Sequence, residues 1–380
     1  MIDISLCRNC GACAEVCPVS ALEMKLEKNG FKYPYLEKDK CIDCGLCHKV
    51  CDRMCSSSLK PVKQTYAARS NSAEICGKCR SGGVFFVLAD KVIRQFNGVV
   101  YGVSINGTDV EFSRVVECEQ LESLVGSKYV WVDHTKKFKE IENDLNKGTV
   151  VLISGLPCQV DSIKNYLDIK NVNQEKLILC DIICHGAPSP KLYKDYICYQ
   201  ENKYGESVKF IDFRNKKNFG WKAHIETLYM KRVIHSDLWT KIFYSHLGLK
   251  NSCFECPYKS KKRAGDISLG DCWNIEKSNL MFNDDKGTSL LLVNSDKGLY
   301  WIERILEKLD FDKIELKDYM QPALEKSVDS PTNYNKFWED YEEYGFEYVL
   351  RRYVKYNWKK KLKCKLKIIY YKFNKMRNMP

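Results

Sequence analysis

The strongest constraint on this chain is a cysteine spacing that occurs twice within its first 51 residues. Each run has the pattern C-x2-C-x2-C-x3-C, and together they supply Cys7, Cys10, Cys13, Cys17, Cys41, Cys44, Cys47 and Cys51. In such a pair of runs, three thiolates of each run bind one 4Fe–4S cubane and the fourth binds the other cubane. The spacing therefore predicts one cluster on Cys7, Cys10, Cys13 and Cys51, and another on Cys41, Cys44, Cys47 and Cys17.

Three other interpretations of these cysteines are weaker. Zinc binds four thiolates, but zinc sites normally consist of two separated C-x2-C pairs rather than two quartets. Disulfides need an oxidising compartment, and the residues after Met1 have no signal-peptide pattern. Cys44, Cys47 and His48 match the haem c attachment pattern, but this pattern lies inside the second quartet. With two such quartets, the stretch resembles the two-cluster bacterial ferredoxins.

The composition is that of a soluble globular chain. Of its 380 residues, 44% are hydrophobic and 29% are charged, and no apolar run is long enough to span a bilayer. A chain of this length is expected to form two or three domains. Twenty cysteines without a secretion signal indicate metal binding in a reducing cytosol, so we expect a cytoplasmic protein.

The net charge of +12 comes from the C-terminal tail. Residues 351–377 contain twelve Lys or Arg and no Asp or Glu, so the remaining chain has 49 basic and 49 acidic residues. This distribution argues against a nucleic-acid groove built into the fold. Because the tail interleaves Lys with Tyr, Trp, Leu and Ile, it is either a solvated basic helix or a contact with an anionic membrane surface or an acidic partner.

From Tyr66 onward, the sequence predicts alternating strands and helices. Strands are predicted at residues 99–105, 110–116, 150–154, 177–183, 208–213, 225–230, 267–269 and 289–293. Helices are predicted at residues 84–96, 136–146, 159–167, 189–199, 299–309 and 334–344. Strands followed by helices are typical of parallel pairing. We therefore predict an α/β core domain with a mixed, largely parallel sheet, preceded by a small α+β ferredoxin-like module.

Three regions are expected along the chain. Residues 1–56 form the two-cluster module, residues 66–330 the α/β domain, and residues 331–380 a helical region with the basic tail. A serine-rich stretch at residues 56–61 is the expected linker between the first two.

Five short motifs mark the α/β part. They are Ser-Gly-Gly at 81–83, Gly-Ser-Lys-Tyr at 126–129, Ser-Gly-Leu-Pro-Cys-Gln at 154–159, Cys-His-Gly-Ala-Pro-Ser-Pro at 184–190, and a C-x2-C pair at 253–256 that runs on to Ala-Gly-Asp-Ile-Ser-Leu-Gly-Asp at 264–271. Their order and content resemble the coenzyme F420 hydrogenase/dehydrogenase beta-subunit family, from Cys7 to about Asp271. The resemblance extends to relatives that reduce chlorophyll intermediates.

The resemblance implies FAD beside a further 4Fe–4S cluster. It places these residues at the flavin: Ser81, Gly82, Gly83, Gly126, Ser127, Lys128, Tyr129, Pro157 and Gln159. Ser-Gly-Gly precedes a predicted helix, where backbone N–H groups can meet a phosphate, although an ordinary helix cap fits as well. Lys128 can balance a pyrophosphate or an anionic reduced flavin, and a solvated lysine is the alternative.

Four further cysteines are expected to bind the third cluster. Cys158 and Cys184 each follow a predicted strand, so both thiols should lie at the C-terminal edge of a parallel sheet, where α/β folds bind cofactors. Cys253 and Cys256 add a C-x2-C pair from a loop. A structural zinc is the main alternative for this foursome.

Other residues receive no firm role. Cys76 and Cys79 have the spacing of a redox C-x-x-C pair, but the family more often has small polar residues there. Cys272 is a possible substitute ligand for Cys184. His185 has no partner visible in the sequence, and the catalytic residues stay unassigned.

The expected function is that of an iron–sulfur flavoprotein oxidoreductase. A flavin takes up two electrons and a cubane passes one at a time, so three clusters and a flavin can connect a two-electron carrier or substrate to a ferredoxin or another redox partner protein. A non-enzymatic electron-transfer subunit and a direct reductase of an organic substrate are the alternatives. No G-x-G-x-x-G fingerprint supports NAD(P) as partner.

Overall fold

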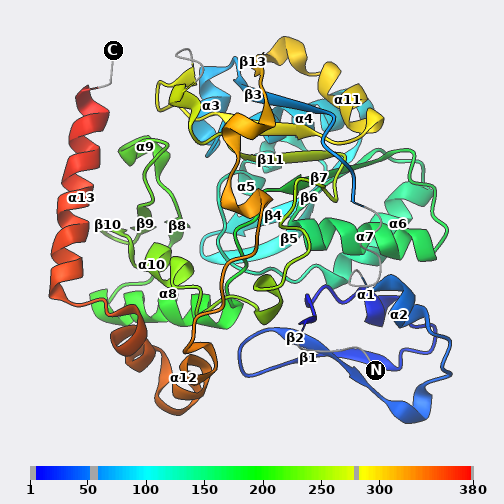
Figure 1. The fold of residues 1–380 in the computed structure, drawn as a ribbon, viewed down its shortest axis with the longest axis horizontal. Helices are drawn as coiled ribbons and strands as arrows, with labels where there is room; N and C mark the ends of the chain where they lie inside the picture. The colour runs from blue at the N-terminus through cyan, green and yellow to red at the C-terminus, as the bar shows by residue number, and fades with distance from the viewer. Residues whose placement is uncertain (1–5, 52–58, 278–281, 378–380) are drawn as a thin grey trace.

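The computed structural model describes residues 6–51, 59–277 and 282–377 (Figure 1). Residues 56–58 of the predicted linker lie outside the described residues. The predicted division at residues 1–56, 66–330 and 331–380 stays a prediction.

The core is a mixed eight-stranded sheet in the order β13-β3-β12-β11-β7-β6-β4-β5. Its strands are β3 (Gln64–Ser70), β4 (Val99–Asn106), β5 (Asp109–Val115), β6 (Val151–Gly155), β7 (Leu177–Ile182), β11 (Ile267–Asp271), β12 (Ser289–Val293) and β13 (Leu309–Lys313). The four central strands β11, β7, β6 and β4 are parallel, and the outer pairs are antiparallel. This confirms the predicted α/β core with its mixed sheet.

Helices cover both faces of the sheet. One face carries α3 (Ala73–Lys78), α4 (Val84–Phe96), α5 (Leu121–Leu124) and α11 (Asp296–Glu303), and the other carries α6 (Phe138–Asn146), α7 (Pro157–Ile169) and α8 (Pro190–Tyr204). The alternation of side chains along a strand explains this layering. In β6, Val151 and Ile153 pack with α7, whereas Leu152 packs with α4.

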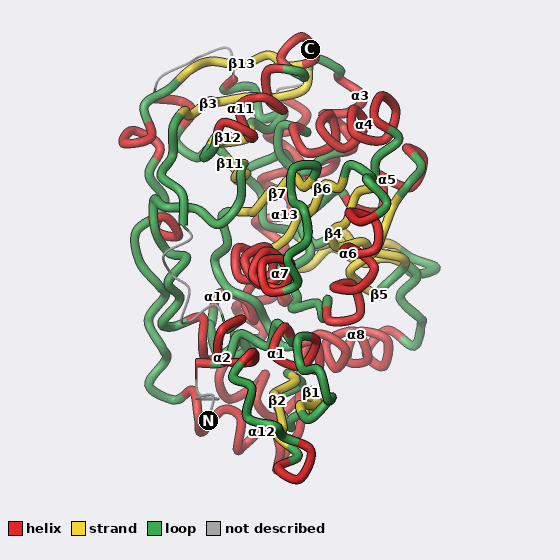
Figure 2. Tube along the Cα trace, turned by 90° about the vertical axis from the view of Figure 1, so that its right-hand side faces the viewer, coloured by secondary structure: helices red, strands yellow, loops and turns green. Residues whose placement is uncertain are grey.

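The N-terminal module is a hairpin with two short helices. It contains α1 (Ala12–Glu15), β1 (Leu22–Leu26), β2 (Lys32–Leu36) and α2 (Leu46–Val50), and β1 pairs antiparallel with β2. The module lies against the α7 side of the core, as the ribbon and the tube view both show (Figures 1 and 2). Ala12, Cys13, Val16 and Val50 belong to the same buried cluster as the core residues on this face.

A smaller sheet and two C-terminal helices complete the described chain. The three-stranded sheet contains β8 (Phe210–Asp212), β9 (Glu226–Tyr229) and β10 (Val233–Ser236), with α9 (Lys216–Phe219) and α10 (Leu238–Tyr244) beside it. The chain ends in α12 (Tyr334–Val349) and α13 (Trp358–Arg377). None of the described helices combines the length and the apolar character needed to cross a bilayer.

The prediction for residues 299–309 is wrong in part. The helix α11 begins at Asp296 and ends at Glu303, and Leu309–Lys313 form the edge strand β13, which pairs with β3. Apolar residues at 302, 305, 306 and 309 fit a helical spacing, but the alternation in Leu-Asp-Phe-Asp-Lys fits an edge strand that is half exposed. Tertiary pairing decides between the two patterns.

Candidate metal centre

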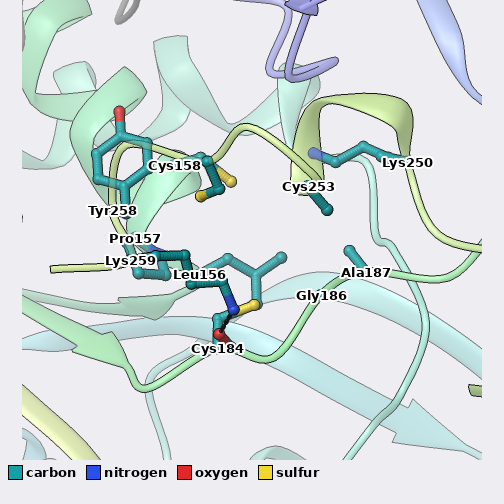
Figure 3. Close-up of a pocket in the computed structure, with 11 residues that line it drawn as sticks. Leu156, Pro157, Cys158, Cys184, Gly186, Ala187, Lys250, Cys253, Tyr258 and Lys259 are labelled. Atoms are coloured by element: carbon teal, nitrogen blue, oxygen red, sulfur yellow. Dashed lines mark hydrogen bonds between the residues drawn. The ribbon is translucent and has the colours of Figure 1, made fainter. Parts of the chain in front are cut away.

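Four cysteines from three segments line one cavity in the α/β part (Figure 3). They are the four that the sequence predicts for a third cluster: Cys158, Cys184, Cys253 and Cys256. The other walls of the cavity come from Leu156, Pro157, Gly186, Ala187, Lys250, Tyr258 and Lys259.

The sheet explains how two of these thiols meet. Strands β6 and β7 are parallel neighbours, and Gly155 at the end of β6 is paired with Asp181 near the end of β7. Cys158 follows β6 in the first turn of α7, which begins at Pro157. Cys184 follows β7 by two residues. The C-terminal edge of two adjacent strands thus delivers both thiols to one place.

A buried ion pair fixes the loop that carries the C-x2-C pair. Asp181 in β7 is 0% exposed at its side chain, and one of its carboxylate oxygens accepts a hydrogen bond of 2.7 Å from Arg263, which is 1% exposed. The other oxygen accepts from the backbone N–H groups of Ala264 (3.0 Å) and Gly265 (2.8 Å). The loop that begins at Cys253 is therefore tied to the strand that leads to Cys184.

The four thiols cannot all ionise without compensation. Burial raises the pKa of Cys184 to about 12, although Lys259 counteracts this, and the other three cysteines raise it further. Burial also raises the pKa of Cys253 and of Cys256. Binding of a cationic metal centre is what stabilises several thiolates in such a place.

Two buried lysines line this cavity. Lys259 is 8% exposed, and its ammonium donates to the backbone carbonyls of Cys184 and His185, the latter at 2.8 Å. Lys250 is 2% exposed, lies 3.5 Å from the centre of the Trp131 ring and donates at 2.6 Å to the carbonyl of Arg8. Both lysines thus bind neutral carbonyl oxygens, and their positive charge is available to an anionic centre.

A zinc ion and a cubane place different geometric demands on four cysteines. Within residues 6–51, 59–277 and 282–377, no three His, Cys, Asp or Glu side chains are arranged to hold a single metal ion. Zinc needs its ligands to converge on one point at about 2.3 Å. A cubane binds its thiolates at four separate corners, so ligands that surround a cavity fit it.

Several cysteines of the N-terminal module lie close enough to influence one another. Burial raises the pKa of Cys13 to about 12, and the neighbouring thiols Cys7, Cys51 and Cys47 raise it further. The pKa of Cys47 is raised by burial, and Cys44 and Cys17 are among the thiols near it. Cys51 of the second run thus lies near Cys13 of the first run, and Cys17 of the first run lies near Cys47 of the second. Backbone N–H groups donate to two of the sulfurs, Asn9 to Cys7 at 3.4 Å and Ala21 to Cys17 at 3.2 Å.

The loop between Cys7 and Cys10 contacts the four-cysteine cavity. Its Arg8 carbonyl accepts the Lys250 hydrogen bond, and its guanidinium lies 5.6 Å from the ring centre of Tyr258. Helix α7, which carries Cys158 in its first turn, packs along its side against α1 and α2. The N-terminal module therefore contacts the α/β part at the cavity itself.

The residues predicted at the flavin are held by protein contacts of several kinds. Gly82 donates its N–H to Ser289 Oγ at 3.0 Å, and a Cβ on Gly82 would lie 2.3 Å from the Ala68 carbonyl oxygen. Ser81 Oγ donates to the Thr288 carbonyl at 2.8 Å. This glycine is thus required for close packing against β3. The following helix α4 has Gly83 at its N-cap and no side-chain cap.

Gln159 and Tyr129 contact residues that line the cavity. Gln159 is 1% exposed, accepts from the Leu156 N–H at 2.9 Å and donates to the Val132 carbonyl at 2.9 Å, so its side chain fixes the start of α7. Lys128 donates to the Val125 carbonyl at 2.8 Å, and burial lowers its pKa to about 7. The Tyr129 ring packs into the cluster that includes Cys158 and Cys253. Gly126 has a φ of 86° with open space beside it, and Ser127 is half-buried.

A buried cationic group lies beside these segments, and the sequence interpretation missed it. It consists of Arg80 next to Ser81, Arg214 after β8, and Lys216 in α9. Arg214 pairs with Asp271 at 2.7 Å and donates to the Tyr129 hydroxyl at 3.3 Å. Burial and Arg214 lower the pKa of Arg80 to about 9, and burial lowers that of Lys216 to about 8.

This cationic group has unsatisfied donors. In the part of the chain that the structure describes, no hydrogen-bond partner is found for the buried nitrogens Arg80 Nε, Arg214 Nε and His224 Nδ1. His224 stacks on Trp273 at 6.2 Å and Trp273 on Trp221 at 5.0 Å. In the sequence, only the position of Arg80 beside Ser-Gly-Gly points to this group, because Arg214 and Lys216 come from a segment without a motif.

The histidine and cysteines to which the sequence assigns no firm role make contacts within the protein. His185 Nε2 lies 2.9 Å from His246 Nε2, a partner that the sequence does not disclose. Cys272 is 0% exposed, packs among apolar residues and is not part of the cavity lining. The Cys76 thiol donates to the Ser70 carbonyl at 3.1 Å, and burial raises the pKa of Cys79 to about 12.

Two family models match the chain. Residues 6–55 match the 4Fe-4S dicluster domain, and residues 148–319 match the C-terminal part of the beta subunit of coenzyme F420 hydrogenase/dehydrogenase. The fold and the matches thus define an α/β domain joined to an iron–sulfur dicluster module. The α/β part thus carries a match to the C-terminal domain of that beta-subunit family, and the N-terminal module a match to the dicluster domain.

Individual relatives share parts of the chain. An uncharacterized protein of Methanocaldococcus jannaschii is 22% identical over 247 residues, which are 55% of this chain and 64% of that protein. An uncharacterized ferredoxin of the same organism is 50% identical over 48 residues, 12% of this chain and 26% of the ferredoxin. The chain thus spans less than two thirds of either relative.

A solved structure also aligns with the chain. A chain from the F420-reducing nickel–iron hydrogenase complex of Methanosarcina barkeri gives a TM-score of 0.49 with 15% sequence identity. The alignment covers 78% of this chain and 92% of that chain.

Proposed function

We propose that this protein is an iron–sulfur flavoprotein oxidoreductase that carries electrons between a redox partner protein and a two-electron carrier or substrate. The observation that supports it most is the cavity lined by four cysteines, which directly adjoins the first cysteine loop of the dicluster module. Three redox centres in one continuous packed region would let electrons pass from the surface module into the α/β domain.

Twelve cysteines would hold three 4Fe–4S clusters. Cluster one is assigned to Cys7, Cys10, Cys13 and Cys51, cluster two to Cys41, Cys44, Cys47 and Cys17, and cluster three to Cys158, Cys184, Cys253 and Cys256. The grouping of thiols around Cys13 and Cys47 supports the crossed assignment of the first two. Lys250 and Lys259 would balance the negative charge of a thiolate-bound cluster in the third site.

FAD is the proposed fourth group, and the buried cationic residues fit it. Arg80, Arg214 and Lys216 carry more positive charge than Asp271 and the nearby Asp212 can balance, and within the described residues Arg80 Nε and Arg214 Nε have no hydrogen-bond partner. Phosphates of a dinucleotide would supply acceptors for those donors. When bound, a flavin supplies the exchange between two-electron and one-electron chemistry. The N–H groups at the start of α4 would add further donors.

A ferredoxin or another redox protein is the proposed partner, and the cytosol is the proposed compartment. The exposed face of the dicluster module carries Cys41 and Cys44, so cluster two would be nearest to a docked partner. The basic C-terminal helix would add a peripheral contact with an anionic membrane.

Anaerobic purification with analysis of iron, sulfide, zinc and flavin in one sample tests the proposal. We expect about twelve irons and twelve sulfides per chain, one FAD released on heating, and little zinc. About eight irons with one zinc would overturn the third cluster. Full iron content without flavin, after reconstitution with FAD, would overturn the flavoprotein and favour an electron-transfer subunit.

Substrate assays then separate the remaining alternatives. If the proposal is right, reduced ferredoxin should reduce a two-electron acceptor only when the protein with all its cofactors is present. Reduction of an organic substrate by dithionite-treated protein without a carrier would instead favour a direct reductase.

A further inference from the structure

The C-terminal helix α13 has two apolar faces, and only one of them is covered. On the covered face, Cys364 is 4% exposed, and Ile368 and Tyr371 pack against a buried cluster that includes Phe219 and Ile225. The helix lies at the outer edge of the molecule beside α9 and the three-stranded sheet (Figure 1). This packing holds the helix in place and fixes which side faces outward.

The opposite face carries a continuous apolar stripe. Its residues are exposed by 50% to 69%: Trp358, Leu362, Leu366, Ile369, Tyr370 and Phe373. At 3.6 residues per turn, residues 362, 366, 369 and 373 lie on one line, and this line is opposite to residues 364, 368 and 371. The protein therefore presents six large apolar side chains to solvent along a helix that it otherwise anchors firmly.

Lysines border this stripe on both sides. The stretch from Trp358 to Lys375 contains eight lysines and no Asp or Glu. By helical spacing, Lys361, Lys365 and Lys372 lie along one flank of the stripe, and Lys359 and Lys363 along the other. An apolar stripe with Trp, Tyr and Phe between two rows of lysine is the pattern of a helix that lies in a membrane interface.

We propose that α13 lies in the plane of an anionic membrane, with its apolar stripe among the lipid headgroups and its lysines at the phosphates. This surface is separate from the cysteine sites, so the inference does not depend on the proposed redox function. The stripe spacing also fits a coiled coil with a second copy, but lysines would then face lysines on both flanks. An acidic protein would match the lysines and leave the aromatic stripe unexplained.

Co-sedimentation of the full-length protein, purified without oxygen, tests this surface. The two probes are vesicles of equal parts phosphatidylglycerol and phosphatidylcholine, and vesicles of phosphatidylcholine alone. We expect binding to the first that is at least tenfold tighter than to the second and that weakens as salt rises. Equal binding to both kinds of vesicle, or to neither, would overturn the proposal.

Two sets of substitutions test the apolar stripe and the flanking lysines separately. Leu362→Ser, Leu366→Ser and Phe373→Ser together should weaken binding at least tenfold, because they remove the stripe. Lys361→Gln, Lys365→Gln and Lys372→Gln together should weaken it and reduce its salt dependence. The matched control is Leu26→Ser, Val233→Ser and Phe311→Ser, which are exposed by 68%, 52% and 42% outside α13 and should leave binding unchanged.

Circular dichroism and iron content show whether each variant is folded, and two outcomes identify other occupants. If light scattering without lipid shows a dimer that the stripe substitutions dissociate, a second copy covers the stripe. If polyglutamate binds as tightly as the vesicles and the stripe substitutions have no effect, the helix binds an acidic protein. Either result overturns the membrane proposal.

Discussion

The two cysteine regions of this protein are built in opposite ways. In the dicluster module, eight cysteines lie within 45 residues, and short turns around α1 and α2 bring them together. In the α/β part, Cys158 and Cys256 are almost a hundred residues apart, and two strand ends and a loop must be assembled before the cavity exists. A site of the first kind is encoded locally, whereas a site of the second kind depends on the whole sheet.

The largest expected effect comes from removing one ligand in each region. Cys253→Ser should lose about four of about twelve irons while the dicluster EPR signals persist. Cys13→Ser should lose cluster-one iron and leave the third site loaded. Iron analysis and EPR of the reduced proteins measure both, with the exposed Cys198→Ser as control. Loss of all iron from Cys253→Ser would show that the two regions do not load independently.

A substitution of Asp181, which is not a predicted cluster ligand, should affect the four-cysteine cavity and not the dicluster module. Asp181→Asn leaves Arg263 buried without its charge partner, and breaking such a pair typically costs about 3–5 kcal/mol. We expect a corresponding drop in unfolding free energy and a third site that loads poorly, measured by denaturant titration and iron content. The exposed pair Lys63–Asp296 is the matched control, since Asp296→Asn should change stability by less than about 1 kcal/mol. Unaltered stability of Asp181→Asn would refute the role of this ion pair in holding the loop.

Charge next to the cavity should set cluster potentials. Lys250→Met removes a buried positive charge that contacts both the cavity and the Arg8 carbonyl, so it should lower the potentials of clusters one and three by on the order of 50–100 mV. Lys259 contacts the Cys184 side alone, so Lys259→Met should lower only the potential of cluster three. EPR-monitored redox titration measures each potential. Identical shifts in both variants would contradict this difference.

The smallest expected effect concerns Lys128 and pH. Because burial lowers the Lys128 pKa to about 7, the side chain loses its positive charge in the free protein as pH rises above 7. Above that pH, binding of an anion that requires the charge is coupled to protonation of Lys128. FAD affinity should therefore be constant below pH 7 and fall by at most about tenfold per pH unit above it. Lys128→Arg keeps the charge and should give a flat profile in fluorescence titrations. A sloping profile in Lys128→Arg would assign the dependence to another group.

The contrast between locally encoded and assembled features also explains what the sequence can predict. Its pattern predicts helix α4 at the observed bounds, because the apolar residues repeat at helical spacing between Gly83 and Asn97. The meeting of Cys158 and Cys184 follows from strand order alone. The cationic group of Arg80, Arg214 and Lys216 cannot be predicted in this way, because isolated basic residues carry no spacing signal and only the folded chain gathers them.

Helix α7 has a mechanical consequence for electron flow. It begins at the cavity with Cys158, and its side supports α1 and α2. One helix thus joins the four-cysteine cavity to the N-terminal module, so the two are held at a fixed separation. Transfer between them would proceed across a fixed gap, so its rate should be insensitive to solvent viscosity.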